Sequence, residues 1–217
     1  MYSPNFVPKK FQDIVQEIQN LHLFKEGWRG KIYRGTLDSR DIIIKTPRNP
    51  ELLKNIRKEA EILEKVNSKG IGPKLIKYGE DFLIEEFVVG IHLKDILNKG
   101  DFAVYDLFEN ILKQARELDK LNISKDEMHR PYTNIIVSGD RPTLLDFESS
   151  KITSNPKNVT QFFSFILSYM KFEIKTKDIE AGIELMKRYK STYHEQEFEN
   201  LIIFFREKKE KIIKKVK

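Results

Sequence analysis

The sequence predicts an α+β protein of two lobes, with an antiparallel sheet in the first lobe and mainly helices in the second. Apolar residues alternate at strand spacing in the first half of the chain and recur at helical spacing beyond Gly90. Strands followed by helices, rather than alternating with them, are typical of α+β folds. The 217 residues suffice for one core or for two small lobes, and no repeat or low-complexity linker divides them. We therefore expect lobes over residues 1–88 and 89–217.

The first lobe is expected to begin with a short amphipathic helix over residues 10–21. The stretch FKEGWRGKIYRGTLDSRDIIIKT then alternates as three antiparallel strands, with turns at Gly27–Gly30 and at Asp38–Ser39. Pro50 opens a helix running through Val66, and the Gly and Pro residues of SKGIGP end it. Two further strands are predicted at residues 74–78 and 81–87.

The second lobe is predicted to contain five helices, over residues 92–98, 103–121, 158–171, 177–190 and 195–213. One stretch interrupts them. The sequence NIIVSGDRPTLLDF, residues 134–147, is typical of two short strands joined by a Gly-Asp turn.

Composition excludes several classes of protein. Because Cys is absent, disulfides, thiolate metal ligands and cysteine nucleophiles are excluded. No apolar run approaches the length of a membrane span, and the first residues do not have the pattern of a signal peptide. We therefore expect a cytoplasmic protein without a membrane partner.

The net charge of +6 favours anionic partners such as nucleotides, nucleic acid or acidic proteins. Much of this charge lies in the final stretch REKKEKIIKKVK. A contact with RNA or the ribosome through this basic tail is one interpretation. The charge pattern favours the other, a solvated amphipathic helix end.

A glycine turn and a lysine indicate a phosphate site in the first lobe. The turn KEGWRGKIYRG brings backbone N–H groups close to any bound ligand, although most such turns are simple hairpins. Lys45 ends the apolar run of the next strand, where its ammonium group would emerge at the edge of a cleft. A solvated lysine at a strand end is the alternative.

The helix after Lys45 contributes a carboxylate. Leu52, Ile56, Leu63 and Val66 form its apolar stripe, and Glu59 falls on the same stripe. A carboxylate on an apolar face requires a partner, and Lys45 on the preceding strand is the natural one.

Asn134 and Asp146 lie at the two ends of the predicted hairpin in the second lobe. A tight hairpin can bring an amide oxygen and a carboxylate together, and Mg²⁺ prefers such oxygen ligands. Read singly, Asn134 is a turn residue and Asp146 a cap.

These elements together resemble the protein-kinase-like superfamily, and most closely its small microbial branches such as the RIO-type and KEOPS-associated kinases. The chain looks like a member of a predicted archaeal serine/threonine kinase group. The resemblance covers about residues 23–150 and rests on five separated elements in the same order. It implies a two-lobed kinase-like fold, ATP as ligand and Mg²⁺ as cofactor.

The resemblance assigns roles in the first lobe. The three glycine positions of the family's loop hold Lys25, Gly27 and Gly30 here, so the first glycine is lost, and Ile32 matches the residue that covers adenine. Lys45 in IIIK matches the lysine that binds the phosphates. Glu59, in IRKEAEIL, matches the glutamate that pairs with it.

In the stretch FLIEEFVVG, the resemblance implies that the backbone of Glu86 to Val88 binds adenine. Glu85 stands at the preceding position, which is usually apolar.

Asn134 of NIIV and Asp146 of LLDFES match the two metal ligands, and Glu148 replaces the glycine that usually follows Asp-Phe. Beyond Ser150 the chain proceeds almost directly into a helix, as in the RIO-like branch. The usual peptide-binding segment is therefore missing, and the acceptor of the phosphate can be a protein or a small molecule.

The main departure from the family concerns the catalytic base. The family has an Asp five residues before the metal-binding Asn, and here that position holds His129. An imidazole can accept a hydroxyl proton at neutral pH. Asp126 and Glu127 are the alternatives if the loop is offset. We therefore expect an ATP-dependent serine/threonine protein kinase, with a nucleotide-binding pseudokinase or scaffold, or a small-molecule kinase, as alternatives.

Overall fold

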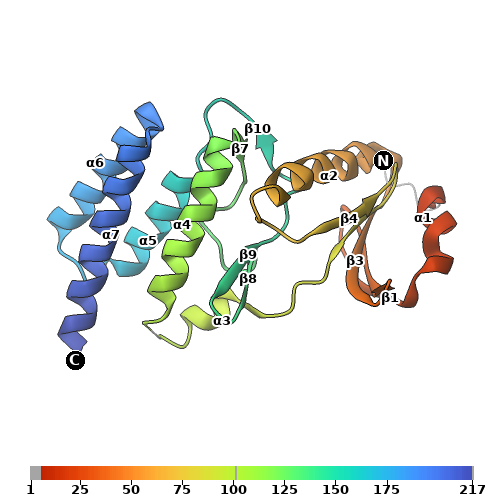
Figure 1. Ribbon diagram of the computed structural model, residues 1–217, viewed down its shortest axis with the longest axis horizontal. Helices are drawn as coiled ribbons and strands as arrows, with labels where there is room; N and C mark the ends of the chain where they lie inside the picture. The colour runs from red at the N-terminus through yellow and green to blue at the C-terminus, as the bar shows by residue number, and fades with distance from the viewer. Residues whose placement is uncertain (1–5, 101, 217) are drawn as a thin grey trace. The chain divides into compact units, whose positions relative to one another are not determined.

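The computed structural model describes residues 6–100 and 102–216 and confirms an α+β protein (Figure 1). The described chain divides into two compact units. The first contains residues 6–89 together with Thr143–Ser150, and the second contains Gly90–Pro142 together with residues 151–216. The structure divides the chain after Val89 rather than after residue 88, and it places Thr143–Ser150, expected in the second lobe, with the first unit.

The first unit contains a five-stranded antiparallel sheet with the order β1-β2-β3-β5-β4. The turns at residues 27–29 and 38–39 lie where the sequence predicted them. The strands are β1 (Gln19–Glu26), β2 (Gly30–Leu37), β3 (Arg40–Pro47), β4 (Leu75–Tyr78) and β5 (Leu83–Glu86).

Alternation along β3 sends its side chains to two faces of the sheet. Ile42 and Ile44 are fully buried in a cluster with Phe11 and Ile14 of the N-terminal helix. Ile43 and Lys45 fall on the opposite face, because successive residues of a strand point in opposite directions.

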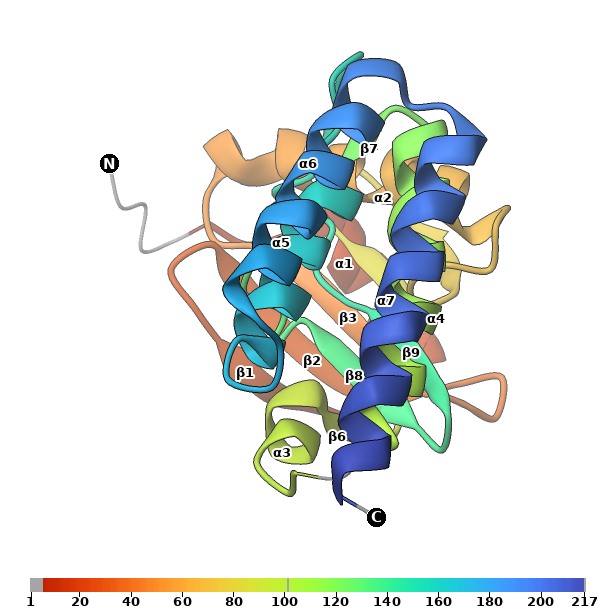
Figure 2. The same cartoon turned by 90° about the vertical axis from the view of Figure 1, so that its left-hand side faces the viewer.

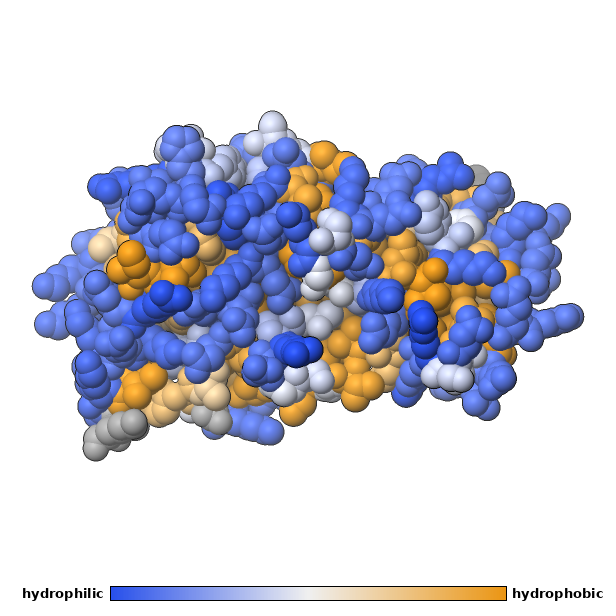
Figure 3. Space-filling view, in the orientation of Figure 1, coloured by the Kyte–Doolittle hydropathy of each residue, from blue (hydrophilic) through white to orange (hydrophobic). Residues whose placement is uncertain are grey.

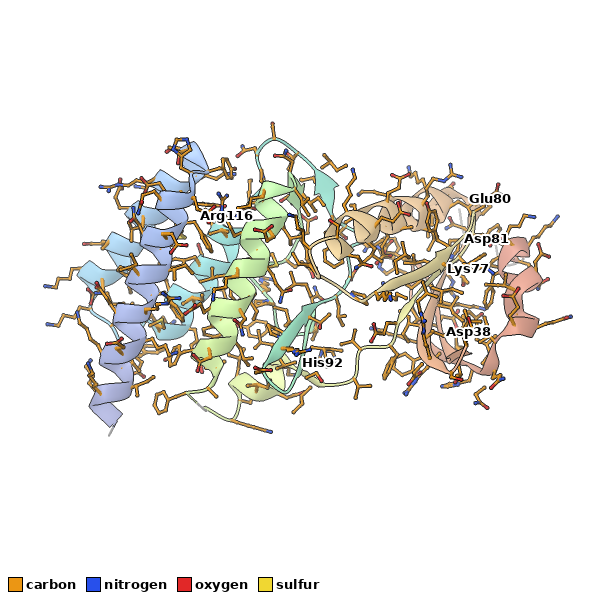
Figure 4. The ribbon with its side chains drawn as sticks, in the orientation of Figure 1. Asp38, Lys77, Glu80, Asp81, His92 and Arg116 are labelled. Carbon is orange, nitrogen blue, oxygen red and sulfur yellow. The ribbon has the colours of Figure 1, made fainter. Side chains whose placement is uncertain are left out.

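The N-terminal helix is shorter than predicted. α1 (Lys9–Ile14) and a 3-10 turn, η1 (Val15–Glu17), are followed directly by β1, so the predicted helix over 10–21 is wrong in its last turn. A buried carboxylate from elsewhere in the chain caps α1: the backbone N–H groups of Lys10 and Phe11 donate to Asp81, each at 2.9 Å (Figure 4). A side-chain oxygen at this position satisfies N–H groups that have no partner within the helix.

Helix α2 (Leu53–Asn67) begins after a 3-10 turn, η2 (Pro50–Leu52), as the sequence predicted from Pro50. Asn49 caps the turn by accepting from Leu52 N–H at 3.2 Å. At the other end, the Asn67 side chain donates to Ile71 and Pro73 carbonyls and accepts from Leu75 N–H. These three bonds fix the return of the chain into β4.

The segment Thr143–Ser150 is held in the first unit by a fully buried ring, Phe147. A Cβ placed on Gly72, whose φ is +78°, would lie 2.9 Å from that ring. Gly72 is therefore required both by its backbone conformation and by the close approach of Phe147.

In the second unit, α4 packs against α5 and α7 (Figure 2). Helix α6 also contacts both α5 and α7. The unit also contains a short helix, and two small sheets whose orders are β6-β8-β9 and β10-β7. Its helices are α3 (Leu93–Leu97), α4 (Val104–Lys120), α5 (Asn158–Met170), α6 (Thr176–Thr192) and α7 (Glu195–Val216). Its strands are β6 (Ile91–His92), β7 (Ile123–Ser124), β8 (Ile135–Ser138), β10 (Lys151–Ile152) and β9 (Arg141–Leu144), the last of which continues into the segment of the first unit.

A buried polar network ties these helices together. The Tyr189 hydroxyl donates to Asp119 at 2.7 Å and accepts from Arg116 of α4 at 3.1 Å (Figure 4). Asn158, at the start of α5, donates to the same Asp119 at 2.7 Å. Burial, with the neighbouring Asp119 charge, raises the pKa of Tyr189 far above its usual range, so the phenol stays protonated.

Hydrophilic residues cover most of the face shown in Figure 3, with hydrophobic residues in separate patches. None of the helices within residues 6–100 and 102–216 combines the length and the apolar character needed to span a bilayer.

Candidate functional site

Lys45 lies in the interior of the sheet in the first unit. β3 continues to Pro47, so the prediction that Lys45 ends its strand is wrong. Ile43 pairs with Glu85 and Lys45 pairs with Leu83, and paired residues of antiparallel strands point to the same face. Lys45 and Glu85 therefore share the face of the sheet opposite to the α1 cluster.

Glu59 reaches the same place from α2. It lies in the apolar stripe of the helix, with Ile56, Leu63 and Val66, as predicted, and its side chain is only 2% exposed. Glu61 and Glu64, on the other faces of α2, are exposed.

The Lys45 ammonium binds two carboxylates at once. Lys45 Nζ lies 2.7 Å from Glu59 Oε1 and 3.0 Å from Glu85 Oε1. The sequence predicted the contact with Glu59 but not the contact with Glu85. The strand alternation of FLIEE was the signal that could have found it, because it places Glu85 on the face of Leu83 and hence of Lys45.

The pKa values of Lys45 and Glu85 in this cluster are both raised, but for different reasons. Burial lowers the pKa of Lys45, but the charges of Glu59 and Glu85 outweigh it and hold that pKa above its ordinary value. For Glu85, burial is the largest influence, and despite the attraction of Lys45 it raises the pKa to about 7. The charges of Glu59 and Asp146 add to this increase. One cation is thus shared by two buried acids, and burial raises the pKa of Glu85 despite that cation.

Asp146 belongs to the same unit through the segment held by Phe147. Its side chain is exposed, and its backbone has φ +60°, a left-handed conformation that is uncommon outside glycine but tolerated by Asp. The electrostatic influence of Asp146 on Glu85 shows that this carboxylate lies within range of the Lys45 cluster.

Glu148, two residues later, connects this segment to two other parts of the first unit. Arg29 Nη1 donates to Glu148 Oε2 at 3.3 Å and to Ser149 Oγ at 3.2 Å. Asn55 of α2 donates to Glu148 Oε1 at 3.2 Å. Glu148 therefore joins the glycine turn to the segment that carries Asp146.

The glycine turn itself is a tight connection between β1 and β2. Gly27 N–H donates to the Gly30 carbonyl at 2.9 Å, and the Arg48 guanidinium donates to the Gly27 carbonyl at 2.9 Å. A Cβ on Gly30 would lie 2.1 Å from the Thr46 carbonyl oxygen, so only glycine fits there. Trp28, at the tip, is 73% exposed.

The remaining candidate ligand residues of the first unit lie on β2 and after β5. Ile32 pairs directly with Lys45 and so shares its face of the sheet. Glu86 N–H already donates to the Lys74 carbonyl at 2.9 Å, and the Glu86 side chain is exposed. Val88 is half-buried just beyond β5.

Asn134 and the three candidate bases lie in the second unit, in the loop before β8. Asn134 Nδ2 donates to Glu127 Oε2 at 2.6 Å. Glu127 has φ +67°, and its carbonyl accepts from Arg130 N–H at 2.8 Å. The side chains of Asp126 and His129 are exposed. Glu127 is thus the candidate base that contacts Asn134.

Comparison with protein-family models and with curated proteins found no match to this chain. The function of the site is therefore inferred from its own residues.

The donor atoms suit a hard cation. Within the described ranges 6–100 and 102–216, no group of three or more His, Asp or Glu side chains is arranged to hold a metal ion. Mg²⁺ does not require such a group, because it commonly binds one or two carboxylates and completes its shell with phosphate oxygens and water. The carboxylate of Asp146, in the first unit, has the chemistry of such a ligand, and so does the amide oxygen of Asn134, in the second unit.

Proposed function

We propose that this protein is an atypical, minimal ATP-dependent phosphotransferase that transfers the γ-phosphate to a serine or threonine hydroxyl of a protein. The observation that carries the proposal is the ion pair between Lys45 of β3 and Glu59 of α2, whose charged atoms lie 2.7 Å apart. Strand β3 pairs with β2, which begins at the tight glycine turn. A lysine fixed by a glutamate is a means of positioning nucleotide phosphates, and phosphoryl transfer depends mainly on such positioning and on charge stabilisation.

Each residue has a role in this proposal. Lys45 binds phosphate oxygens and Glu59 orients it. Ile32 and the backbone of Glu86 to Val88 hold the adenine, and the turn from Gly27 to Gly30 covers the phosphates. Asp146 in the first unit and Asn134 in the second would each offer an oxygen ligand to Mg²⁺, which would neutralise phosphate charge when bound.

In the transfer step, the acceptor hydroxyl oxygen forms a bond to the γ-phosphorus as the bond to the β,γ-bridging oxygen breaks. The hydroxyl proton passes to a base, and ADP leaves. His129 is the first candidate for that base, since its exposed imidazole stands at the family's catalytic position. Asp126 and Glu127 are the alternatives, and Glu127 is already bound to Asn134.

A nucleotide-binding pseudokinase is the second candidate. It is favoured by the His at position 129 in place of Asp, and by the engagement of the Asn134 amide with Glu127. A pseudokinase binds ATP and transfers no phosphate.

Transfer of label from γ-labelled ATP with Mg²⁺ tests the proposal. The assay follows label on the protein, on generic protein acceptors and on small alcohols and sugars, for the wild type, Asp146→Ala and His129→Ala. Asp140→Ala, which removes an exposed carboxylate from the turn between β8 and β9, is the matched control.

We expect label in the wild type and the control and none in Asp146→Ala. Loss of a general base lowers such a rate by roughly 10²- to 10⁴-fold, which is the effect expected for His129→Ala. Loss only in Asp146→Ala would move the base to Asp126 or Glu127. Label on small alcohols alone would make the protein a small-molecule kinase, and ATP binding without any transfer would establish the pseudokinase.

A further inference from the structure

The Lys45 cluster holds one positive charge against two buried carboxylates. The side chains of Glu59 and Glu85 are 2% and 8% exposed, and both bind the same ammonium group. If both acids are ionised, the cluster carries one uncompensated negative charge inside the first unit. Such a charge is costly, because burial removes the water that would otherwise stabilise it.

The two carboxylates are not equivalent. Glu85 Oε2 is buried and has no hydrogen-bond partner among the described residues, whereas Glu85 Oε1 contacts Lys45. An ionised oxygen without a partner is more costly than a protonated one. Because Oε2 is closed off from solvent in this arrangement, a bound ligand cannot reach it directly. A proton is the ligand that fits it.

The charged groups facing Glu85 come from three elements. Lys45 on β3 attracts its charge, while Glu59 on α2 and Asp146 in the segment 143–150 repel it. On the other neighbouring strand, β4, the residue paired with Glu85 is Leu75, which has no charge. An anion that binds Lys45 would therefore add a further negative charge beside Glu85, whose buried carboxylate already has two anionic neighbours and a single cation.

We propose that Glu85 is a positioning residue for the phosphate site, and that binding of a polyphosphate at Lys45 is coupled to uptake of a proton by the Glu85 carboxylate. This inference rests on the proposed function, because it needs phosphate at Lys45. An acid of the buffer gives up the proton, and an O–H bond forms at Oε2. Neutral Glu85 then leaves Lys45 with Glu59 and the phosphate as its anionic partners.

Isothermal titration of MgATP at pH 8 tests the coupling. The binding enthalpy is measured in phosphate-free buffers of low and high ionisation enthalpy. Its slope against the ionisation enthalpy of the buffer gives the number of protons taken up. If the added charge raises the pKa of Glu85 by about one to two units, the wild type takes up about 0.4 to 0.8 proton per ATP. A terminal phosphate bound to a cation would instead release protons, so the sign separates the two sources.

Glu85→Gln keeps the shape and an oxygen for Lys45 but cannot titrate, and we expect its proton uptake to fall to zero while ATP still binds. Glu61→Gln, which changes an exposed glutamate of α2, is the control and should take up as many protons as the wild type. If Glu85→Gln does not fold, the carboxyl ¹³C resonance of Glu85 in the wild type gives the same answer. It should titrate near neutral pH and at higher pH once MgATP is added.

ATP binding by the wild type without proton uptake, or uptake that persists in Glu85→Gln, would overturn this inference alone. No MgATP binding by folded wild-type protein would overturn the proposed function and this inference together.

Discussion

Replacing Glu85 with Gln should stabilise the first unit at alkaline pH and not at acid pH. The pKa of Glu85 is about 7 in the folded protein, against 4.5 for an ordinary glutamate. This difference corresponds to about 3 kcal/mol between the two protonation states. Because Glu85 is buried with its carboxylate partly unpartnered, the folded protein bears that cost whenever the group is ionised.

The direction of the pH dependence follows from proton binding. Below pH 4.5 the carboxyl is protonated in both folded and unfolded chains and has no effect. Between pH 4.5 and 7 the folded chain binds more protons than the unfolded chain, so wild-type stability falls as pH rises. Above pH 7 the loss is complete. Glu85→Gln lacks this loss, so its free energy of unfolding relative to wild type should rise by about 2 to 3 kcal/mol from pH 5 to pH 8.

Urea unfolding at pH 5 and pH 8 measures this difference. The methyl resonances of Ile42 and Ile44, which are fully buried in the first unit, report its unfolding. Glu61→Gln is the control, and its difference from wild type should change by less than about 0.5 kcal/mol between the two pH values. The reasoning is refuted if the Glu85→Gln difference is the same at both pH values, or if the variant loses stability relative to wild type as pH rises.

Three further substitutions test other contacts. Asp81→Asn removes an acceptor from the start of α1 and should cost about 1 to 2 kcal/mol, while Asp38→Asn in an exposed turn should change urea stability by less than about 0.5 kcal/mol. Tyr189→Phe removes one hydrogen bond from each of two buried partners, Asp119 and Arg116, and should cost about 1 to 3 kcal/mol in urea unfolding of the second unit. A cost no larger than that of the exposed Tyr78→Phe would mean that the network contributes nothing. Arg29→Met removes the half-exposed ion pair with Glu148, so stability should fall by less than about 1 kcal/mol, but amide hydrogen exchange in residues 24–34 should become faster. Unchanged exchange would contradict the inference that this ion pair fixes the glycine turn.

Much of the fold was predictable because its elements are long and strongly patterned. The three strands before Pro50 and the long helices of the second unit follow hydrophobic alternation and helical spacing, and their positions agree with the structure to within a few residues. The error at the N-terminus has a physical cause. Residues from Gln19 onward pair with β2, and this pairing overrides the local helical pattern.

Two-residue strands such as β6, β7 and β10 are too short to carry a periodic signal, so the sequence could not reveal them. The sequence also did not predict that Asp146 belongs to the first unit. This position depends on the packing of Phe147 against Gly72, a contact between residues far apart in the chain.

The candidate site was predictable where a single residue conflicted with its surroundings. Glu59 on an apolar stripe required a cation, and Lys45 is that cation. The contact between Glu85 and Lys45 was not predicted, because it depends on the register of β5 against β3, which local sequence spacing does not reveal. Glu127 is a candidate base from its position in the sequence, but its hydrogen bond to Asn134 depends on a loop with a left-handed residue, which spacing alone does not predict.

The most direct test of the account is the dissociation constant of MgATP for the wild type, Lys45→Met and Lys77→Met. Lys77, on β4, is 44% exposed and pairs with Glu17 at the surface, so its loss should leave binding unchanged within about threefold. Loss of a charge-assisted phosphate contact at Lys45 should weaken binding by about 10- to 100-fold.

Removing Lys45 leaves two buried acids without their cation. The same change in a Glu59→Gln, Glu85→Gln background therefore provides a charge-balanced variant for the measurement, and that background alone serves as its reference. The account predicts weaker MgATP binding when Lys45 is lost in either background, and unchanged binding when Lys77 is lost. Equal affinity with and without Lys45 in folded protein, or no binding by the wild type, would contradict it.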